Sequence, residues 1–148
     1  MVVYTPELLN LLLNLILTIM TKEDKELLLK DLSARLYYGV KTKTPYNDAS
    51  IVGIVNRKGA RKDIDYTDVV TDKQTYPIKY IQPYLRPISS MTEEEVDIFT
   101  QFDVYADGEY VMPNYEAIDW LNAHHFDYRG LIERGLAIEV TEDNNPYK

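Results

Sequence analysis

Four short segments rich in strand-forming residues constrain the fold more than any other feature of this sequence. They cover residues 37–44, 50–55, 63–70 and 76–81, and clusters of Pro, Asn, Asp, Gly and Lys separate them. Val, Ile, Thr and Tyr favour extended backbone, and strands this short at this spacing are typical of antiparallel neighbours joined by turns. We therefore expect an α+β fold built on a curved antiparallel sheet, or a small partial barrel, of about four strands. Pro83 and Pro87 are expected to end this sheet, because proline cannot donate to a ladder.

Helical signals lie on both sides of the predicted sheet. Leucines at positions 28, 29, 32 and 36 recur at helical spacing, which predicts a helix over residues 22–35. Thr92 and Glu95 match a capping box and predict a helix start after the sheet. Asp107-Gly108 is typical of a tight hairpin turn. The sequence thus predicts N-terminal helices, then the sheet, then further helical elements.

The segment 115–140 contains the only Trp and both His of the chain. It predicts a helix, a turn at residues 127–130 and a closing strand at residues 136–140. The polar residues 141–148 that follow are expected to fray, as chain ends often do. We expect residues 21–148 to form a single α+β domain with this helix-turn-strand unit at its C-terminal end.

Residues 8–20 are nearly all apolar, and Asn10, Asn14 and Thr18 fall on one narrow stripe of a helix. A membrane span needs about 20 apolar residues, so this run of 13 predicts no membrane span. A secretory signal would begin with a positively charged segment, which the sequence does not show. We expect residues 1–20 to form an apolar N-terminal helix, a possible extension or interface, packed on the domain or on another copy. The expected interface residues are Leu8, Leu12, Leu15 and Ile19.

Composition excludes several classes of function. The chain has no cysteine, which rules out disulfides and thiolate metal sites and favours a cytoplasmic setting. A net charge of −8 disfavours general nucleic-acid binding, because each phosphate contact needs a cation. Gly-rich phosphate loops, nucleophile elbows and HExxH motifs are missing from the sequence. We therefore assign no catalytic residue, no metal and no cofactor.

The pair His124-His125 is the most reactive-looking cluster, and with Asp127 it could serve acid–base chemistry or hold a metal. Adjacent residues on a helix point about 100° apart, so both His cannot bind one ion unaided. We expect one His to lie at the helix end and the other to pack beside Trp120. Arg129 is expected to pair with a nearby carboxylate such as Glu133 or Asp127. The residues expected to support the fold here are Trp120, His125, Asp127 and Arg129.

Four cations lie close together in the turn of residues 57–62. They are Arg57, Lys58, Arg61 and Lys62. Such a cluster could contact phosphates locally despite the acidic whole, although charge runs are usually solvated loops. The turn is therefore the candidate binding site for an alternative function, nucleic-acid association.

Segments 21–41, 78–95 and 117–139 are similar to a group of small proteins encoded in gut Bacteroidales genomes, their phages and other mobile elements. The resemblance covers roughly Met20 to Glu139, and it implies no assigned activity, since the group has none. Members usually begin near the position of Met20, so residues 1–19 depart from the pattern.

Taken together, the residues favour a non-enzymatic module for protein interaction or self-association, with a protein partner or a second copy as its target. Its basis is the apolar N-terminal run and the 13 Tyr, whose amphipathic rings suit interfaces. Three alternatives stay open: nucleic-acid binding through residues 57–62, an acidic mimic of DNA, and a hydrolase-like enzyme using His125 and Asp127.

Overall fold

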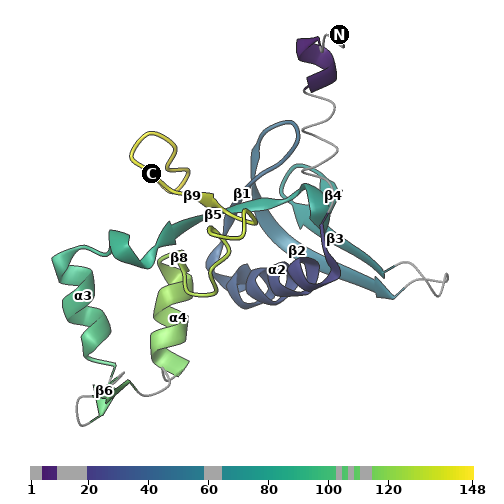
Figure 1. The fold of residues 1–148 in the computed structure, drawn as a ribbon. Helices are drawn as coiled ribbons and strands as arrows, with labels where there is room; N and C mark the ends of the chain where they lie inside the picture. The colour runs from purple at the N-terminus through teal and green to yellow at the C-terminus, as the bar shows by residue number, and fades with distance from the viewer. Residues whose placement is uncertain (1–4, 10–19, 59–64, 103–104, 107–108, 111–114) are drawn as a thin grey trace.

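The computed structural model describes residues 5–9, 20–58, 65–102, 105–106, 109–110 and 115–148 (Figure 1). Residues 6–9 are helical. The further helices and strands, in chain order, are α2 (Lys22–Arg35), β1 (Lys41–Lys43), β2 (Asp48–Lys58), β3 (Asp65–Thr71), β4 (Thr75–Pro77), β5 (Gln82–Pro87), α3 (Glu93–Thr100), β6 (Tyr105–Ala106), β7 (Glu109–Tyr110), α4 (Tyr115–Ala123), β8 (Phe126–Asp127) and β9 (Ile138–Glu139). The α+β class is confirmed, as is the predicted helix over residues 22–35.

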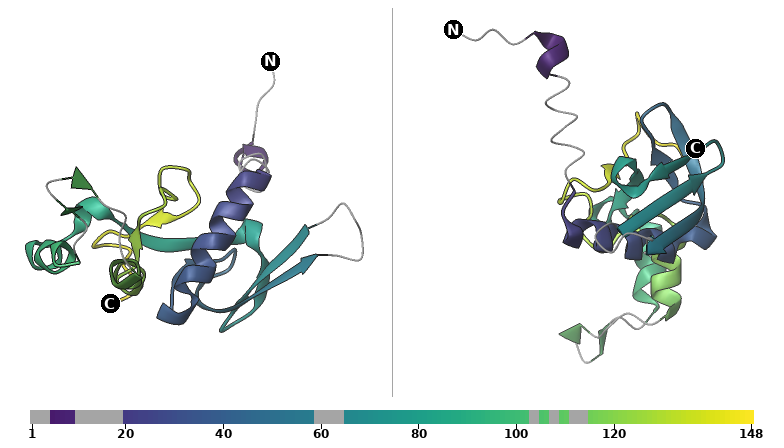
Figure 2. Two further views of the ribbon diagram at one scale, coloured as in Figure 1. Left: turned by 90° about the horizontal axis from the view of Figure 1, so that it is seen from below. Right: turned by 90° about the vertical axis from the view of Figure 1, so that its right-hand side faces the viewer.

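The main sheet has seven strands in the order β4-β3-β2-β1-β5-β8, with β9 also paired to β5. The pairs from β4 to β5 are antiparallel, as predicted. Strands β8 and β9 add to β5 in parallel, so the sheet is mixed and larger than four strands. It is curved and open, and its β2–β3 ribbon extends past the neighbouring strands (Figures 1 and 2).

A bulge in β2 contributes to this curvature. The register of β2 with β3 shifts between Ile51 and Gly53, so Val52 is the extra residue. One extra residue lets positions 51 and 54 face the same side, although a regular strand would separate them. Ile51 is buried, Ile54 packs against the core, and Val52 is left 57% exposed.

The core lies between α2 and the sheet (Figure 2, left). Leu28 and Leu32 of α2 are fully buried against residues of four strands and of the C-terminal turn. The other fully or nearly fully buried members are Val40, Ile51, Val69, Ile78, Ile81, Leu85 and Leu131. Removing this apolar area from water drives the chain to close around α2.

Two predicted strands are shorter than expected. The segment 37–44 starts with a 3-10 turn over Leu36–Tyr38, and Gly39 at φ 74° redirects the chain before β1 begins. The segment 76–81 divides into β4 and a 3-10 turn over Ile78–Tyr80. That turn brings Ile78 and Ile81 together into the core, which alternating strand geometry would not do.

The prediction that prolines end the sheet at residues 83–87 is wrong, because these residues form β5, a strand with partners on both edges. Pro83 and Pro87 are four residues apart, so their missing N–H groups face the same edge. Tyr84 and Arg86 face the opposite edge, where the Arg86 N–H donates to the carbonyl of His125 at 2.7 Å. The two-residue strand β9 pairs with β5 along the edge where the proline N–H groups are missing.

Helices α3 and α4 stand side by side at the end of the molecule away from the β2–β3 ribbon (Figure 1). The predicted capping box is confirmed: the Glu95 N–H donates to the Thr92 hydroxyl, and the Glu95 carboxylate accepts from the Thr92 N–H. Between the helices, Ala106 of β6 pairs with Glu109 of β7, as the hairpin prediction requires. Within the described ranges, no helix is long and apolar enough to cross a membrane.

Candidate functional site

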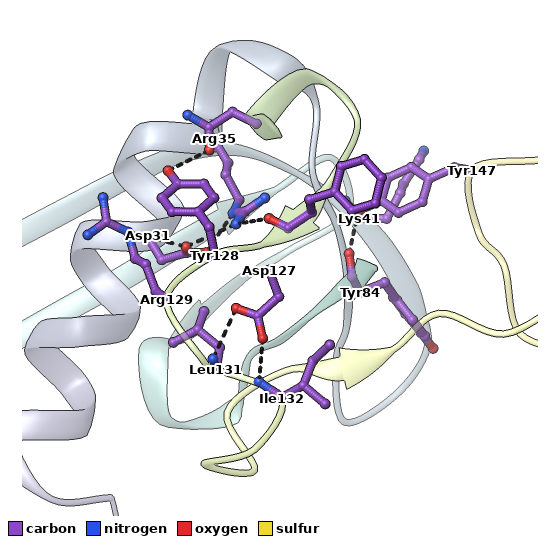
Figure 3. A network of polar contacts seen from close by, with 12 residues as sticks. Asp31, Arg35, Lys41, Tyr84, Asp127, Tyr128, Arg129, Leu131, Ile132 and Tyr147 are labelled. Carbon is purple, nitrogen blue, oxygen red and sulfur yellow. Dashed lines mark hydrogen bonds and ion pairs between the residues drawn. The ribbon is translucent and has the colours of Figure 1, made fainter. Parts of the chain in front are cut away.

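A buried ion pair on α2 contacts residues 126–129, the segment that follows α4 (Figure 3). Asp31 and Arg35 lie one helical turn apart, and both side chains are fully buried. The Arg35 Nε and Nη2 donate to the two carboxylate oxygens of Asp31 at 2.7 and 3.2 Å. Burial raises the pKa of the Asp31 carboxyl, and the charge and hydrogen bonds of Arg35 oppose that rise.

Arg35 connects α2 to the C-terminal unit. Its Nη2 also donates to the carbonyl of Phe126 in β8 at 2.6 Å, and its guanidinium lies over the ring of Tyr128. The Tyr128 hydroxyl donates in turn to the Asn122 side chain of α4 at 2.8 Å. Arg35 and Tyr128 together therefore join α2, α4 and β8.

Arg129 contributes to the same network rather than to a local turn contact. Its Nε lies 3.5 Å from the Asp31 carboxylate, which differs from the expected partners Glu133 and Asp127. Asp31 is 98 residues away in the sequence but lies beside Arg129 in the fold (Figure 3). The buried charge of Asp31 attracts a second cation, since a buried carboxylate is costly unless it is well paired.

Asp127 holds the turn that follows β8. Its two carboxylate oxygens accept hydrogen bonds from the N–H groups of Leu131 and Ile132, each at 3.0 Å. Leu131 is thereby set into the core, where it is fully buried. Both oxygens of Asp127 are engaged in this way, so the carboxylate acts as a backbone cap.

His125 has an unusual environment. Its φ of 64° makes it the one described non-glycine residue in the left-handed region, where it ends α4 in the place usually taken by glycine. Its Nδ1 is buried without a hydrogen-bond partner. Burial, with smaller effects from Arg35, His124 and Arg86, lowers the pKa of the imidazole to about 4. A neutral, covered ring without a bond to Asp127 is poorly suited to act as a general base with that residue.

The tail also differs from the expectation of a frayed end. Tyr147 stacks on His125 with ring centroids 3.6 Å apart and planes inclined by 10°. The Tyr147 hydroxyl donates to the carbonyl of Tyr84 at 2.8 Å and accepts from the N–H of Lys41 at 3.0 Å (Figure 3). The tail is anchored because its penultimate side chain completes the sheet.

Trp120 gathers an aromatic cluster between α3, α4 and β8. The His124 ring stacks on it at 4.4 Å, while the rings of Phe99, Phe102 and Phe126 lie 5.6–6.2 Å from it. The expected contact between one His and Trp120 is thus confirmed for His124. Phe126 alone of these rings is fully buried. The cluster is what holds α3, which has no buried residue, against α4.

The two other sets of predicted site residues are separate from this network. Arg57 and Lys58 occupy the last two positions of β2, opposite Tyr66 and Asp65, while Arg61 and Lys62 lie outside the described residues. Of the expected interface residues only Leu8 is described, and it is exposed, as is its neighbour Leu9. Leu12, Leu15 and Ile19 lie outside the described part.

Sequence reasoning missed the Asp31–Arg35 pair, although a signal was present. Residues 28, 31, 32 and 35 share the spacing of one helical face, and Leu28 and Leu32 mark that face as buried. An acid and an arginine four residues apart on an apolar face indicate a buried pair.

Comparison with known proteins gives no further assignment: no family model, curated protein or solved structure matches the chain. Among the described residues no group of three or more His, Asp or Glu is placed to hold a metal ion. The network in Figure 3 joins buried side chains to the backbone carbonyl of Phe126 and to the N–H groups of Leu131 and Ile132.

Proposed function

We propose that this chain is a non-enzymatic module for protein interaction whose partner is a second copy of itself. The observation that carries this proposal is the exposure of Leu8 and Leu9, 39% and 47%, at the start of the apolar run of residues 8–20. The described helix at residues 6–9 lies apart from the sheet in all three views (Figures 1 and 2). Apolar helices of this kind gain stability by burying their leucines against another surface.

Elsewhere in the chain, polar side chains of the types used in catalysis make contacts that support the fold, and this favours a non-enzymatic role. Asp127 caps a turn, His125 is covered by Tyr147, and Asp31 is paired with Arg35. The link to phages or mobile elements, and a cytoplasmic setting, form part of the same proposal and rest on the sequence resemblance and on the lack of cysteine.

Self-association is expected to weaken at least ~100-fold when the apolar face is made polar, since each buried leucine contributes about 1.5–3 kcal/mol and tenfold corresponds to about 1.4 kcal/mol. The variant changes four residues to serine, and sedimentation velocity over a concentration series measures the effect. The four are Leu8, Leu12, Leu15 and Ile19. The matched control, Asn10→Ser with Asn14→Ser, should associate like the parent. A parent chain that stays monomeric to ~100 µM, a range in which even weak dimers form, would contradict the proposal.

Nucleic-acid association is a second candidate, favoured by the shape of the β2–β3 ribbon. Its ladder continues to the pair Lys58–Asp65, beyond the positions where β1 and β4 pair with it. Arg57 and Lys58, the described part of the basic segment, thus lie at the far end of a two-stranded projection, where a nucleic acid could approach without contacting the acidic remainder.

This second candidate predicts salt-sensitive retardation of single-stranded DNA in a gel-shift assay. Reversing Arg57, Lys58, Arg61 and Lys62 to Glu should abolish the retardation, because their charges displace counterions. The matched control reverses four exposed lysines elsewhere: Lys22, Lys30, Lys43 and Lys79. Equal loss in both variants, or no retardation by the parent, would exclude a specific role for the turn.

A further inference from the structure

One edge of β5 is completed by three different parts of the chain. Near its start, Gln82 and Pro83 pair with Lys43 and Thr42 of β1. At its end, the Arg86 N–H bonds to His125, next to β8. Tyr84 and Arg86 are two residues apart, so their backbone groups face this same edge. Between β1 and β8, the carbonyl of Tyr84 is taken by the side chain of Tyr147.

The Tyr147 hydroxyl replaces a direct strand-to-strand hydrogen bond. Continuing the β1–β5 register by one residue would set Lys41 opposite Tyr84. Instead, the Lys41 N–H donates to the hydroxyl at 3.0 Å and the hydroxyl donates to the Tyr84 carbonyl at 2.8 Å. A hydroxyl offers one donor and two acceptor sites, so it satisfies both backbone groups at once. A phenylalanine ring would leave both unpaired.

The imidazole of His125 is the surface on which the phenol ring of Tyr147 stacks. The two rings are nearly parallel at 3.6 Å, and the left-handed backbone of His125 directs the imidazole there. A non-glycine residue in this conformation is energetically costly and persists where its surroundings demand it. Its buried Nδ1, which has no partner, adds to that cost. The strained conformation of His125 thus serves the stacking contact with the Tyr147 ring.

The segment that delivers Tyr147 contributes little else to the fold. Residues 141–144 are exposed, and the hydrophobic core includes no residue after Ala137. Asn144 and Asn145 close short local turns through Thr141, Glu139 and the Tyr147 N–H. The tail is therefore held mainly through one tyrosine, as a bound peptide would be.

We propose that Lys41, Tyr84 and His125 form a binding site for a tyrosine-bearing peptide, and that the chain's own Tyr147 fills this site as an intramolecular ligand. The site selects an unmodified tyrosine, because the Tyr84 carbonyl needs a hydroxyl that donates, and a phosphate ester cannot donate there. A short tether presents Tyr147 at an effective concentration of order millimolar, so an external peptide binds once the tail is displaced. This inference goes beyond the proposed self-association and does not depend on it.

The test uses the full chain with Tyr147→Ser and a labelled synthetic peptide of residues 141–148. Fluorescence anisotropy is expected to show binding to the variant and at least ~10-fold weaker binding to the parent, whose tail competes. A peptide with phenylalanine at the position of Tyr147 should bind at least ~10-fold more weakly, since two buried backbone groups stay unpaired. The control variant Tyr46→Ser, which changes a tyrosine that is 80% exposed, should behave like the parent.

Two results would overturn the proposal: a folded Tyr147→Ser chain that binds no peptide at ~1 mM, the scale of the tethered ligand, or equal binding of the tyrosine and phenylalanine peptides. If Tyr147→Ser does not fold, hydrogen exchange on Tyr147→Phe decides. The Lys41 amide should then exchange at least ~10-fold faster than in the parent, while the Leu32 amide in α2 is unchanged. Unchanged exchange at Lys41 would equally overturn the proposal.

Discussion

Replacing Arg35 with methionine is expected to lower the free energy of unfolding by about 3–5 kcal/mol, because it leaves the fully buried Asp31 without its main partner. The carbonyl of Phe126 would lose a donor at the same time. Methionine has similar length and no charge, so the effect reports the broken pair rather than a large cavity. Urea denaturation followed by circular dichroism measures it.

The double variant Asp31→Leu with Arg35→Met should recover most of this loss, since an apolar pair can replace a buried ion pair at little cost. Lys30→Met, on the exposed side of the same helix, serves as the control and should stay within about 0.5 kcal/mol of the parent. A loss below about 1 kcal/mol for Arg35→Met would show that Asp31 is not held as a buried charge.

Replacing Phe126 with alanine is expected to destabilise the chain by a similar amount, about 3–5 kcal/mol. Phe126 is fully buried and lies between the ring of Trp120 at 5.6 Å and the guanidinium of Arg86 at 4.1 Å. It is the one member of the aromatic cluster that joins α4 to the sheet through β8. Its loss should therefore also alter the fluorescence of Trp120, the only tryptophan.

Phe99→Ala provides the matched comparison, because Phe99 lies at a similar distance from Trp120 but is only half-buried on α3. It should cost no more than about half as much as Phe126→Ala, in proportion to the apolar area removed from water. Equal losses for the two variants would mean that α3 belongs to the cooperative core, contrary to its lack of buried residues.

Local signals predicted the elements well where neighbours along the chain decide them. The leucine spacing of residues 28–36, the Thr92–Glu95 capping box and the pairing of Ala106 with Glu109 all depend on contacts within a few residues. The strand segments of residues 50–55 and 63–70 were located for the same reason, since strand propensity and turn residues are local.

Local rules failed where a partner distant in sequence decides the outcome. Pro83 and Pro87 are tolerated in β5 because both lack an N–H donor on the same edge of the strand. Whether a donor is needed on that edge depends on how β1, β8 and β9 pair with β5. Tyr147 is ordered because Lys41 and Tyr84 present a matching donor and acceptor. Arg129 likewise pairs with Asp31 because the fold brings these two distant charges together.

By itself, the sequence determined the α+β class, the helix over residues 22–35, the antiparallel ladder from β1 to β4 and the capping of α3, since periodicity and propensity act over a few residues. Only the tertiary structure decided that β8 and β9 join β5 in parallel, that Arg35 bonds to the carbonyl of Phe126 and that Tyr147 closes the sheet edge. Each of these depends on groups far apart in the chain meeting with compatible charge or hydrogen-bonding capacity. Desolvation makes such pairing necessary, and only the folded backbone determines which groups can meet.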